Sequence, residues 1–180
     1  MLRQAESVQK FLAPCEHLVI IEDRGYSKSF WIDQLKKYYP NHKLTVKSPD
    51  DFNGIVSENY MGWARQQAFK ILASLDCDDK YLIIDSKDFF IKPTQLSEWD
   101  DYMGSNCLVD TSTMYNPFYL RMASTYSLYF NEDIIENIFE PTTPFVFDAK
   151  YFVKKELKHD VKEFLKLTDC WSEFIYYSYL

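Results

Sequence analysis

Residues Tyr81-Leu82-Ile83-Ile84-Asp85-Ser86-Lys87-Asp88 form an apolar run that ends in charged residues. Parallel strands of α/β domains carry such continuous hydrophobic runs because both of their faces are buried. Ligands bind to open α/β sheets beyond the carboxyl ends of these strands. The stretch therefore predicts a buried parallel strand with Asp85 and Asp88 at a ligand-binding edge. Two carboxylates there can hold a divalent cation, which in turn can bind a diphosphate.

Helices and strands alternate on either side of this run. The spacing of apolar residues predicts helices at 2–12, 31–38 and 60–75. Short apolar runs predict strands at 17–22 and 43–47, and the polar stretch 48–59 predicts a loop. This alternation predicts an α/β fold with a mostly parallel sheet and right-handed crossovers. Beyond residue 96 the pattern predicts strands at 107–109 and 142–147 and helices at 118–130, 149–158 and 172–180.

Composition restricts the class of protein. A chain of 180 residues is long enough for one domain with a hydrophobic core. The net charge of -7 and the absence of a basic run argue against binding to nucleic acid. No apolar stretch approaches the roughly 20 residues that a membrane-spanning helix needs. We therefore expect a soluble, cytoplasmic protein without a membrane span.

Cysteine and histidine residues show no recognisable metal or redox motif. The cysteines are widely separated and form no C-x-x-C pair: Cys15, Cys77, Cys107 and Cys170. The histidines show no mutual spacing typical of a metal site: His17, His42 and His159. We therefore expect reduced thiols, and histidines at the surface or at strand ends. The chain also lacks a Gly-rich phosphate loop, which argues against a Rossmann dehydrogenase or a P-loop kinase.

The predicted helix at 60–75 has two different faces. One is an apolar stripe, and the other carries Trp63, Gln66, Gln67 and Lys70 at helical spacing. A solvated face is the commoner explanation of such a pattern. If the helix borders the strand edge at Asp85, the amides and the ammonium can instead bind a nucleotide or sugar hydroxyls.

Several segments together resemble a family. They are Gly62-Trp63-Ala64-Arg65-Gln66-Gln67-Ala68-Phe69-Lys70, Tyr81 to Ser86, Phe90-Ile91-Lys92-Pro93, Thr143-Pro144-Phe145-Val146-Phe147 and Ser172-Glu173-Phe174-Ile175-Tyr176-Tyr177. Their order and spacing resemble a group of largely uncharacterised glycosyltransferase-like proteins with the GT-A fold. The resemblance implies a Rossmann-like, three-layer α/β domain over 1–180. Residues 1–95 would form its nucleotide-sugar-binding half and 96–180 its acceptor-side half.

The resemblance also implies a chemistry. In this family a D-x-D motif holds manganese or magnesium against the donor diphosphate, where the ion stabilises the charge of the leaving group. Asp85 matches the first position of the motif, but Lys87 stands at the second and Asp88 follows one residue too late. Either the chain turns so that Asp85 and Asp88 converge on a metal, or the ammonium of Lys87 replaces the metal as a point charge.

The remaining roles follow from the same resemblance. Glu173 is the first candidate for the general base that deprotonates the acceptor hydroxyl, with Asp148 and Asp169 as weaker ones. We expect the donor to contact Asp23, Trp63, Gln66, Gln67, Lys70, Ser86 and Asp88. The partners would be a nucleotide sugar and a glycan or other hydroxyl acceptor, and the exposed aromatic residues make a homo-oligomer an open alternative.

Two features keep other functions open. No apolar run precedes the first predicted helix, so we expect the usual first strand of the GT-A fold to be lacking, and Lys87 interrupts the metal motif. Both features fit a catalytically degenerate module of the same fold that binds a nucleotide or glycan, or that serves only as a structural subunit. A haloacid-dehalogenase-like phosphohydrolase would also use Asp85, but it requires a second aspartate where Lys87 stands.

Overall fold

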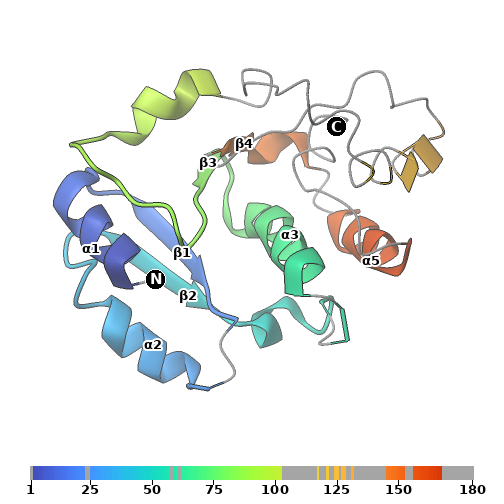
Figure 1. Cartoon of the computed structure of the whole chain (residues 1–180), viewed down its shortest axis with the longest axis horizontal. Helices are drawn as coiled ribbons and strands as arrows, with labels where there is room; N and C mark the ends of the chain where they lie inside the picture. The colour runs from blue at the N-terminus through green and yellow to red at the C-terminus, as the bar shows by residue number, and fades with distance from the viewer. Residues whose placement is uncertain are drawn as a thin grey trace. The chain divides into compact units, whose positions relative to one another are not determined.

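A computed structural model of the chain, drawn in Figure 1, describes residues 2–22, 25–56, 59–60, 62–102, 145–152 and 156–167, with single residues between 117 and 131. The chain divides into two compact units. The first contains Met1–Gly54 and Ile84–Asp101, and the second contains Ile55–Ile83 and Tyr102–Leu180. The described part is mixed α/β, as the sequence predicts.

The first unit is built from two helix–strand pairs. Helix α1 spans Leu2–Phe11, β1 spans Glu16–Ile20, α2 spans Lys28–Leu35 and β2 spans Lys43–Lys47. Strands β1 and β2 pair in parallel, which confirms the prediction for these two strands. A short 3-10 helix at Pro49–Phe52 lies within the predicted loop. Helix α2 ends before the predicted residue 38, and its first turn is capped by the hydroxyl of Ser27, which accepts from the Phe30 N–H at 3.2 Å.

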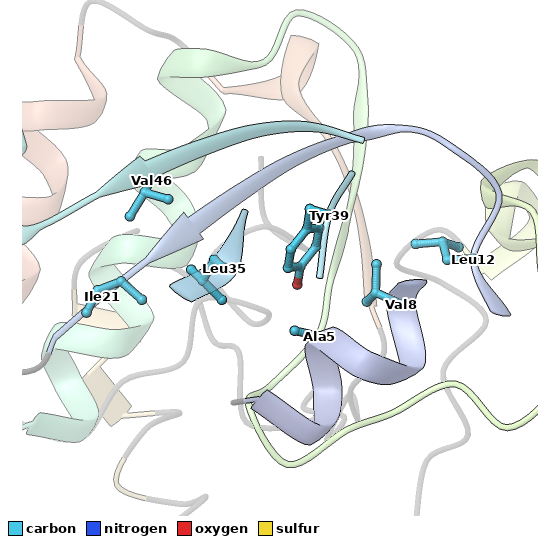
Figure 2. Close-up of a cluster of buried hydrophobic side chains, with 7 residues drawn as sticks. All are labelled: Ala5, Val8, Leu12, Ile21, Leu35, Tyr39 and Val46. Atoms are coloured by element: carbon cyan, nitrogen blue, oxygen red, sulfur yellow. The ribbon is translucent and has the colours of Figure 1, made fainter. Parts of the chain in front are cut away.

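Alternation along the strands explains which side chains enter the core of the first unit. The register pairs His17 with Leu44 and Val19 with Val46, so the odd-numbered residues of β1 share a face with the even-numbered residues of β2. Helices α1 and α2 contribute to the same core. Figure 2 shows the buried side chains, which come from both helices, from β2 and from the segments that follow α1, β1 and α2: Ala5, Val8, Leu12, Ile21, Leu35, Tyr39 and Val46.

The segment that follows β3 is attached to helix α1. The backbone N–H of Phe90 donates to the Ser7 hydroxyl at 3.0 Å, and that hydroxyl donates to the Gln4 carbonyl at 2.7 Å. Farther along, Thr94 forms a parallel bridge with Leu12. Because Ser7 is largely buried, these bonds connect α1 to the segment in a place with little exposure to water.

Replacing Ser7 by alanine is expected to lower the free energy of unfolding by about 1–2 kcal/mol, because the Phe90 N–H loses its acceptor in a partly buried place. Urea denaturation measures the change. The matched control is Ser97→Ala at an exposed position, for which we expect a change within about 0.5 kcal/mol. Equal losses in both variants would contradict the structural role of Ser7.

The second unit combines helices with an antiparallel strand pair. Helix α3 spans Gly62–Leu72 and continues as a 3-10 turn over Ala73–Asp76, β3 spans Lys80–Ile83 and β4 spans Phe145–Asp148. A 3-10 turn at Ala149–Tyr151 follows β4, and α5 spans Leu157–Leu167. Helix α3 packs against α5. The predicted helix at 60–75 and the predicted extended segment at 142–147 are thus confirmed in their described parts. The predicted helix at 149–158 is wrong at Ala149–Tyr151, which form the 3-10 turn, and its last two residues begin α5; residues 153–155 lie outside the described part.

The environment of β3 differs from the prediction. Strand β3 pairs antiparallel with β4, so Tyr81 faces Phe147 and Lys80 faces Asp148. Only Ile83 of this strand is buried, so its apolar run does not reflect burial on both faces. The reason is that the run indicates a strand but not its partner, and β4 lies more than 60 residues later in the chain. Among the described residues the sheet is one parallel and one antiparallel pair, not one mostly parallel sheet.

Asp148, at the end of β4, is a buried carboxylate whose charge is compensated. Its Oδ2 lies 2.5 Å from the ammonium of Lys150, and its Oδ1 accepts from the Lys150 N–H at 3.1 Å. Burial raises the pKa of Asp148, but these bonds and the charge of Lys80 outweigh it and hold the pKa below its usual value. The side chain is therefore committed to the fold of the second unit.

The Asp148→Asn variant is expected to lose more stability at neutral than at acidic pH. Because the folded pKa of Asp148 is depressed, its ionisation stabilises the fold above the unfolded pKa of about 3.9. That contribution is lost as pH falls through the folded pKa. Urea denaturation of wild type and variant between pH 7 and pH 3 checks this, and the difference should shrink on a Lys150→Met background. A difference that grows toward acidic pH would contradict it.

Several predicted elements lie outside the described residues. These are the strand at 107–109, the helix at 172–180 and most of the helix at 118–130. In the part of the chain that is described, none of the helices has the length and apolarity needed to cross a membrane.

Candidate functional site

The charged cluster after β3 forms a closed turn in the first unit. The Asp88 N–H donates to the Asp85 carbonyl at 2.9 Å, and the Asp88 carboxylate accepts from the Asp85 N–H, also at 2.9 Å. The side chain of Gln4, from α1, donates to the same Asp85 carbonyl at 2.6 Å. Two hydrogen bonds therefore close the turn, and the third, from Gln4, connects it to α1.

This geometry gives Asp85 and Asp88 different surroundings from those of a simple two-carboxylate metal site. Oδ2 of Asp88 is bonded to the backbone N–H of Asp85, so a metal would have to share that oxygen or use only the other one. Among the described residues, neither aspartate belongs to a group of three or more potential ligand side chains with clustered donor atoms. The turn thus accounts for Asp88 without a cation.

Lys87 and Ser86 stand at the tip of the turn. Both are exposed, whereas Asp85 and Asp88 are half-buried. Within the described part of the chain, the Lys87 ammonium forms no ion pair. An exposed ammonium can approach an anionic ligand without first breaking an internal pair. Lys87 is therefore the cationic group of this turn that is accessible to an anion.

The candidate donor-binding residues on α3 belong to the second unit and differ in exposure. Gln66 is exposed, Trp63 and Lys70 are half-buried, and Gln67 is buried. The predicted polar face is therefore only partly solvated. The predicted apolar stripe is buried at Ala64, Ala68, Ile71 and Leu72. Lys70 also takes part in the fold through its carbonyl, which accepts from the Tyr81 hydroxyl at 3.2 Å.

The structure does not test most of the other predicted site residues. Glu173, Asp169 and Asp23 lie outside them. Asp148, the weaker candidate base, is buried and bonded to Lys150, as described above. The proposed base therefore stays a prediction that rests on the sequence.

A cluster that the sequence analysis missed lies at the amino ends of β1 and β2. The Sγ of Cys15 is 3.3 Å from Nε2 of His17 and 3.9 Å from Nδ1 of His42, and the two nitrogens are 2.9 Å apart. The spacing of the cysteines and histidines indicates no metal or redox motif, yet the structure brings these three side chains together. The sequence feature that could have revealed the cluster is Cys15-x-His17 at the start of one strand with His42 just before its parallel neighbour. In paired strands these positions share one face.

The surroundings of this cluster favour uncharged groups. Burial and the neighbouring His42 lower the pKa of His17 to about 4, and burial lowers the pKa of His42 against the opposing effect of a backbone hydrogen bond with Cys15. Burial raises the pKa of the Cys15 thiol. Near neutral pH the cluster therefore holds two neutral imidazoles and a protonated thiol, which differs from the thiolate–imidazolium pair of an activated cysteine nucleophile.

Comparison with known proteins adds no relative. No protein-family model matches the chain, and searches of curated proteins and of solved structures give no match. The resemblance to GT-A glycosyltransferases therefore stays a prediction from the sequence segments named above.

Proposed function

We propose that this chain is a glycosyltransferase-like protein of the GT-A type that binds a nucleotide sugar, with Lys87 in place of the usual divalent cation. The observation that carries the proposal is the turn at Asp85–Asp88. Its Asp88 carboxylate accepts from the Asp85 N–H, while the Lys87 side chain is exposed at its tip. An ammonium there would neutralise the donor diphosphate directly and stabilise the charge that develops on the leaving nucleotide.

The mixed α/β composition of the described residues is compatible with the proposal. The finer features, a three-layer Rossmann-like fold and a general base at Glu173, come from the family resemblance. In this scheme the base would remove the proton of the acceptor hydroxyl as the sugar transfers. Asp85 would orient Lys87 or a sugar hydroxyl.

A calorimetric screen tests the proposal. The purified chain is titrated, with and without Mn²⁺, with a panel that includes UDP-glucose, UDP-galactose, UDP-N-acetylglucosamine and GDP-mannose. The Asp85→Ala variant is then titrated with any nucleotide sugar that binds to the wild type. We expect binding of at least one nucleotide sugar and its loss or marked weakening in the variant. Absence of binding to every member under both conditions would refute the proposed function.

A degenerate module of the same fold is the second candidate, because the Asp88 carboxylate serves the turn rather than an open metal position. It predicts binding of a nucleotide sugar without turnover. The two functions are separated by a turnover assay. The protein is incubated with a donor that binds, and chromatography detects free sugar or sugar transferred to an acceptor. Detectable turnover that disappears in Glu173→Gln excludes the module.

A further inference from the structure

The Cys15, His17 and His42 cluster belongs to the first unit and is unrelated to the turn at Asp85. Cys15 and His17 lie two residues apart at the start of β1, so both side chains project to the same side of the strand. The register Glu16↔Lys43 places His42 beside Cys15, and the Lys43 N–H donates to the Cys15 carbonyl at 3.1 Å. Two paired strands therefore bring the three side chains together.

Backbone hydrogen bonds fix the positions of these side chains. Tyr39-Pro40-Asn41-His42 is a turn closed by the His42 N–H, which donates to the Tyr39 carbonyl at 3.2 Å. The Tyr39 ring is buried in the core, and its edge contacts place it 4.8 Å from the ring of His17 and 5.9 Å from that of His42. Just before Cys15, the Ala13 N–H donates to the Thr94 carbonyl at 3.0 Å. The cluster is thus held by the fold before any ligand arrives.

The spacing of the donor atoms suits a tetrahedral metal ion. With Zn–S of about 2.3 Å and Zn–N of about 2.05 Å, ideal tetrahedral angles place sulfur about 3.6 Å from each nitrogen and the nitrogens about 3.4 Å apart. The observed separations are 3.3 and 3.9 Å for sulfur and 2.9 Å for the nitrogens. Shifts of about half an ångström, within reach of side-chain rotation, would bring the three donor atoms to the spacing of tetrahedral zinc ligands.

The chemistry of the donors selects the class of metal. One sulfur and two imidazole nitrogens suit zinc and related transition metals, whereas magnesium, manganese and calcium prefer oxygen ligands. Neutral imidazoles are the form that binds metal. The lone pair of His42 Nδ1 now accepts from the Cys15 N–H at 3.3 Å, a long hydrogen bond that a metal would replace.

We propose that Cys15 Sγ, His17 Nε2 and His42 Nδ1 bind one zinc ion. All three residues are half-buried, so water or an external ligand can complete the fourth position. Binding displaces the thiol proton of Cys15 to solvent and forms the sulfur–zinc bond, with no change in oxidation state. The ion would connect the start of β1 to the start of β2 and to the turn at Tyr39.

The test uses the full chain after removal of bound metal by a chelator. Calorimetry with Zn²⁺ should give one tight site, and Co²⁺ should give visible d–d bands of a tetrahedral ion with a near-ultraviolet thiolate charge-transfer band. Cys15→Ser should remove the charge-transfer band, and His42→Asn should raise the zinc Kd at least tenfold. Asparagine keeps an oxygen that can accept from the Cys15 N–H, so this variant tests ligation without opening the backbone.

Matched control variants show whether the zinc and cobalt binding comes from this cluster. Cys77→Ser and His159→Ala alter a half-buried thiol and a histidine elsewhere in the chain, and both should bind zinc and cobalt as the wild type does. Circular dichroism of each variant confirms folding. The proposal is overturned if the wild type binds no zinc at micromolar concentration, or if folded Cys15→Ser and His42→Asn retain wild-type affinity.

Discussion

Replacing Phe147 by alanine is expected to destabilise the second unit by about 3–5 kcal/mol, more than any other single change considered for this unit. Phe147 is fully buried in β4, with its ring 5.5 Å from that of Tyr81 and 5.6 Å from that of Phe152. Truncation removes both edge contacts and leaves a cavity that the surrounding strands and helices fill only in part. The free energy of unfolding from urea denaturation measures the effect.

Two variants provide the controls for this prediction. Phe147→Leu keeps most of the side-chain volume and should cost clearly less than the alanine variant. Phe89→Ala removes the same ring from a position that is 62% exposed, so a small change is expected. If Phe147→Ala were no more destabilising than Phe89→Ala, the antiparallel pairing of β3 with β4 around this side chain would be wrong.

Replacing Lys87 by methionine is expected to weaken the binding of the nucleotide-sugar donor about tenfold to hundredfold. This range corresponds to the loss of one hydrogen bond to a charged group, about 1.5–3 kcal/mol. Methionine keeps the length of the side chain and removes its charge. Because Lys87 is exposed and forms no ion pair within the described residues, the stability of the fold should change little.

Arginine at the same position separates charge from shape. Lys87→Arg should retain part of the affinity, since it keeps a cation that can contact a phosphate. Calorimetry with the donor found in the screen, together with thermal unfolding of each variant, measures both effects. Equal donor affinity in wild type and folded Lys87→Met would contradict the role of the ammonium.

Local features of the fold could be predicted from the sequence. The periodicity of α1 and the apolar runs of β1 and β2 depend on near neighbours, and the predicted strand at 43–47 coincides with β2. The direction of β3 could not be predicted in the same way. Its run of apolar residues favours a parallel strand but does not exclude an antiparallel neighbour. The cross-strand pairs of Tyr81 with Phe147 and of Lys80 with Asp148 join distant parts of the chain.

In the candidate sites, too, local features could be predicted from the sequence and long-range contacts could not. The charged turn at Asp85–Asp88 could be located because it follows an apolar run, but the bond from the Asp85 N–H to the Asp88 carboxylate depends on the exact turn geometry. The Cys15–His17–His42 cluster depends on strand register. The spacing of cysteine and histidine along the sequence does not reveal it, because Cys15 and His42 become neighbours only through the parallel pairing of β1 with β2.

The manganese dependence of donor binding shows whether Lys87 takes the place of the divalent cation. The donor Kd is determined by calorimetry on metal-free wild-type protein, without and then with millimolar Mn²⁺. If Lys87 replaces the divalent cation, the protein binds the donor without metal, and Mn²⁺ changes the Kd by less than about threefold, well under the tenfold that 1.4 kcal/mol represents. Donor binding that requires Mn²⁺, with an affinity unchanged in Lys87→Met, would contradict the account.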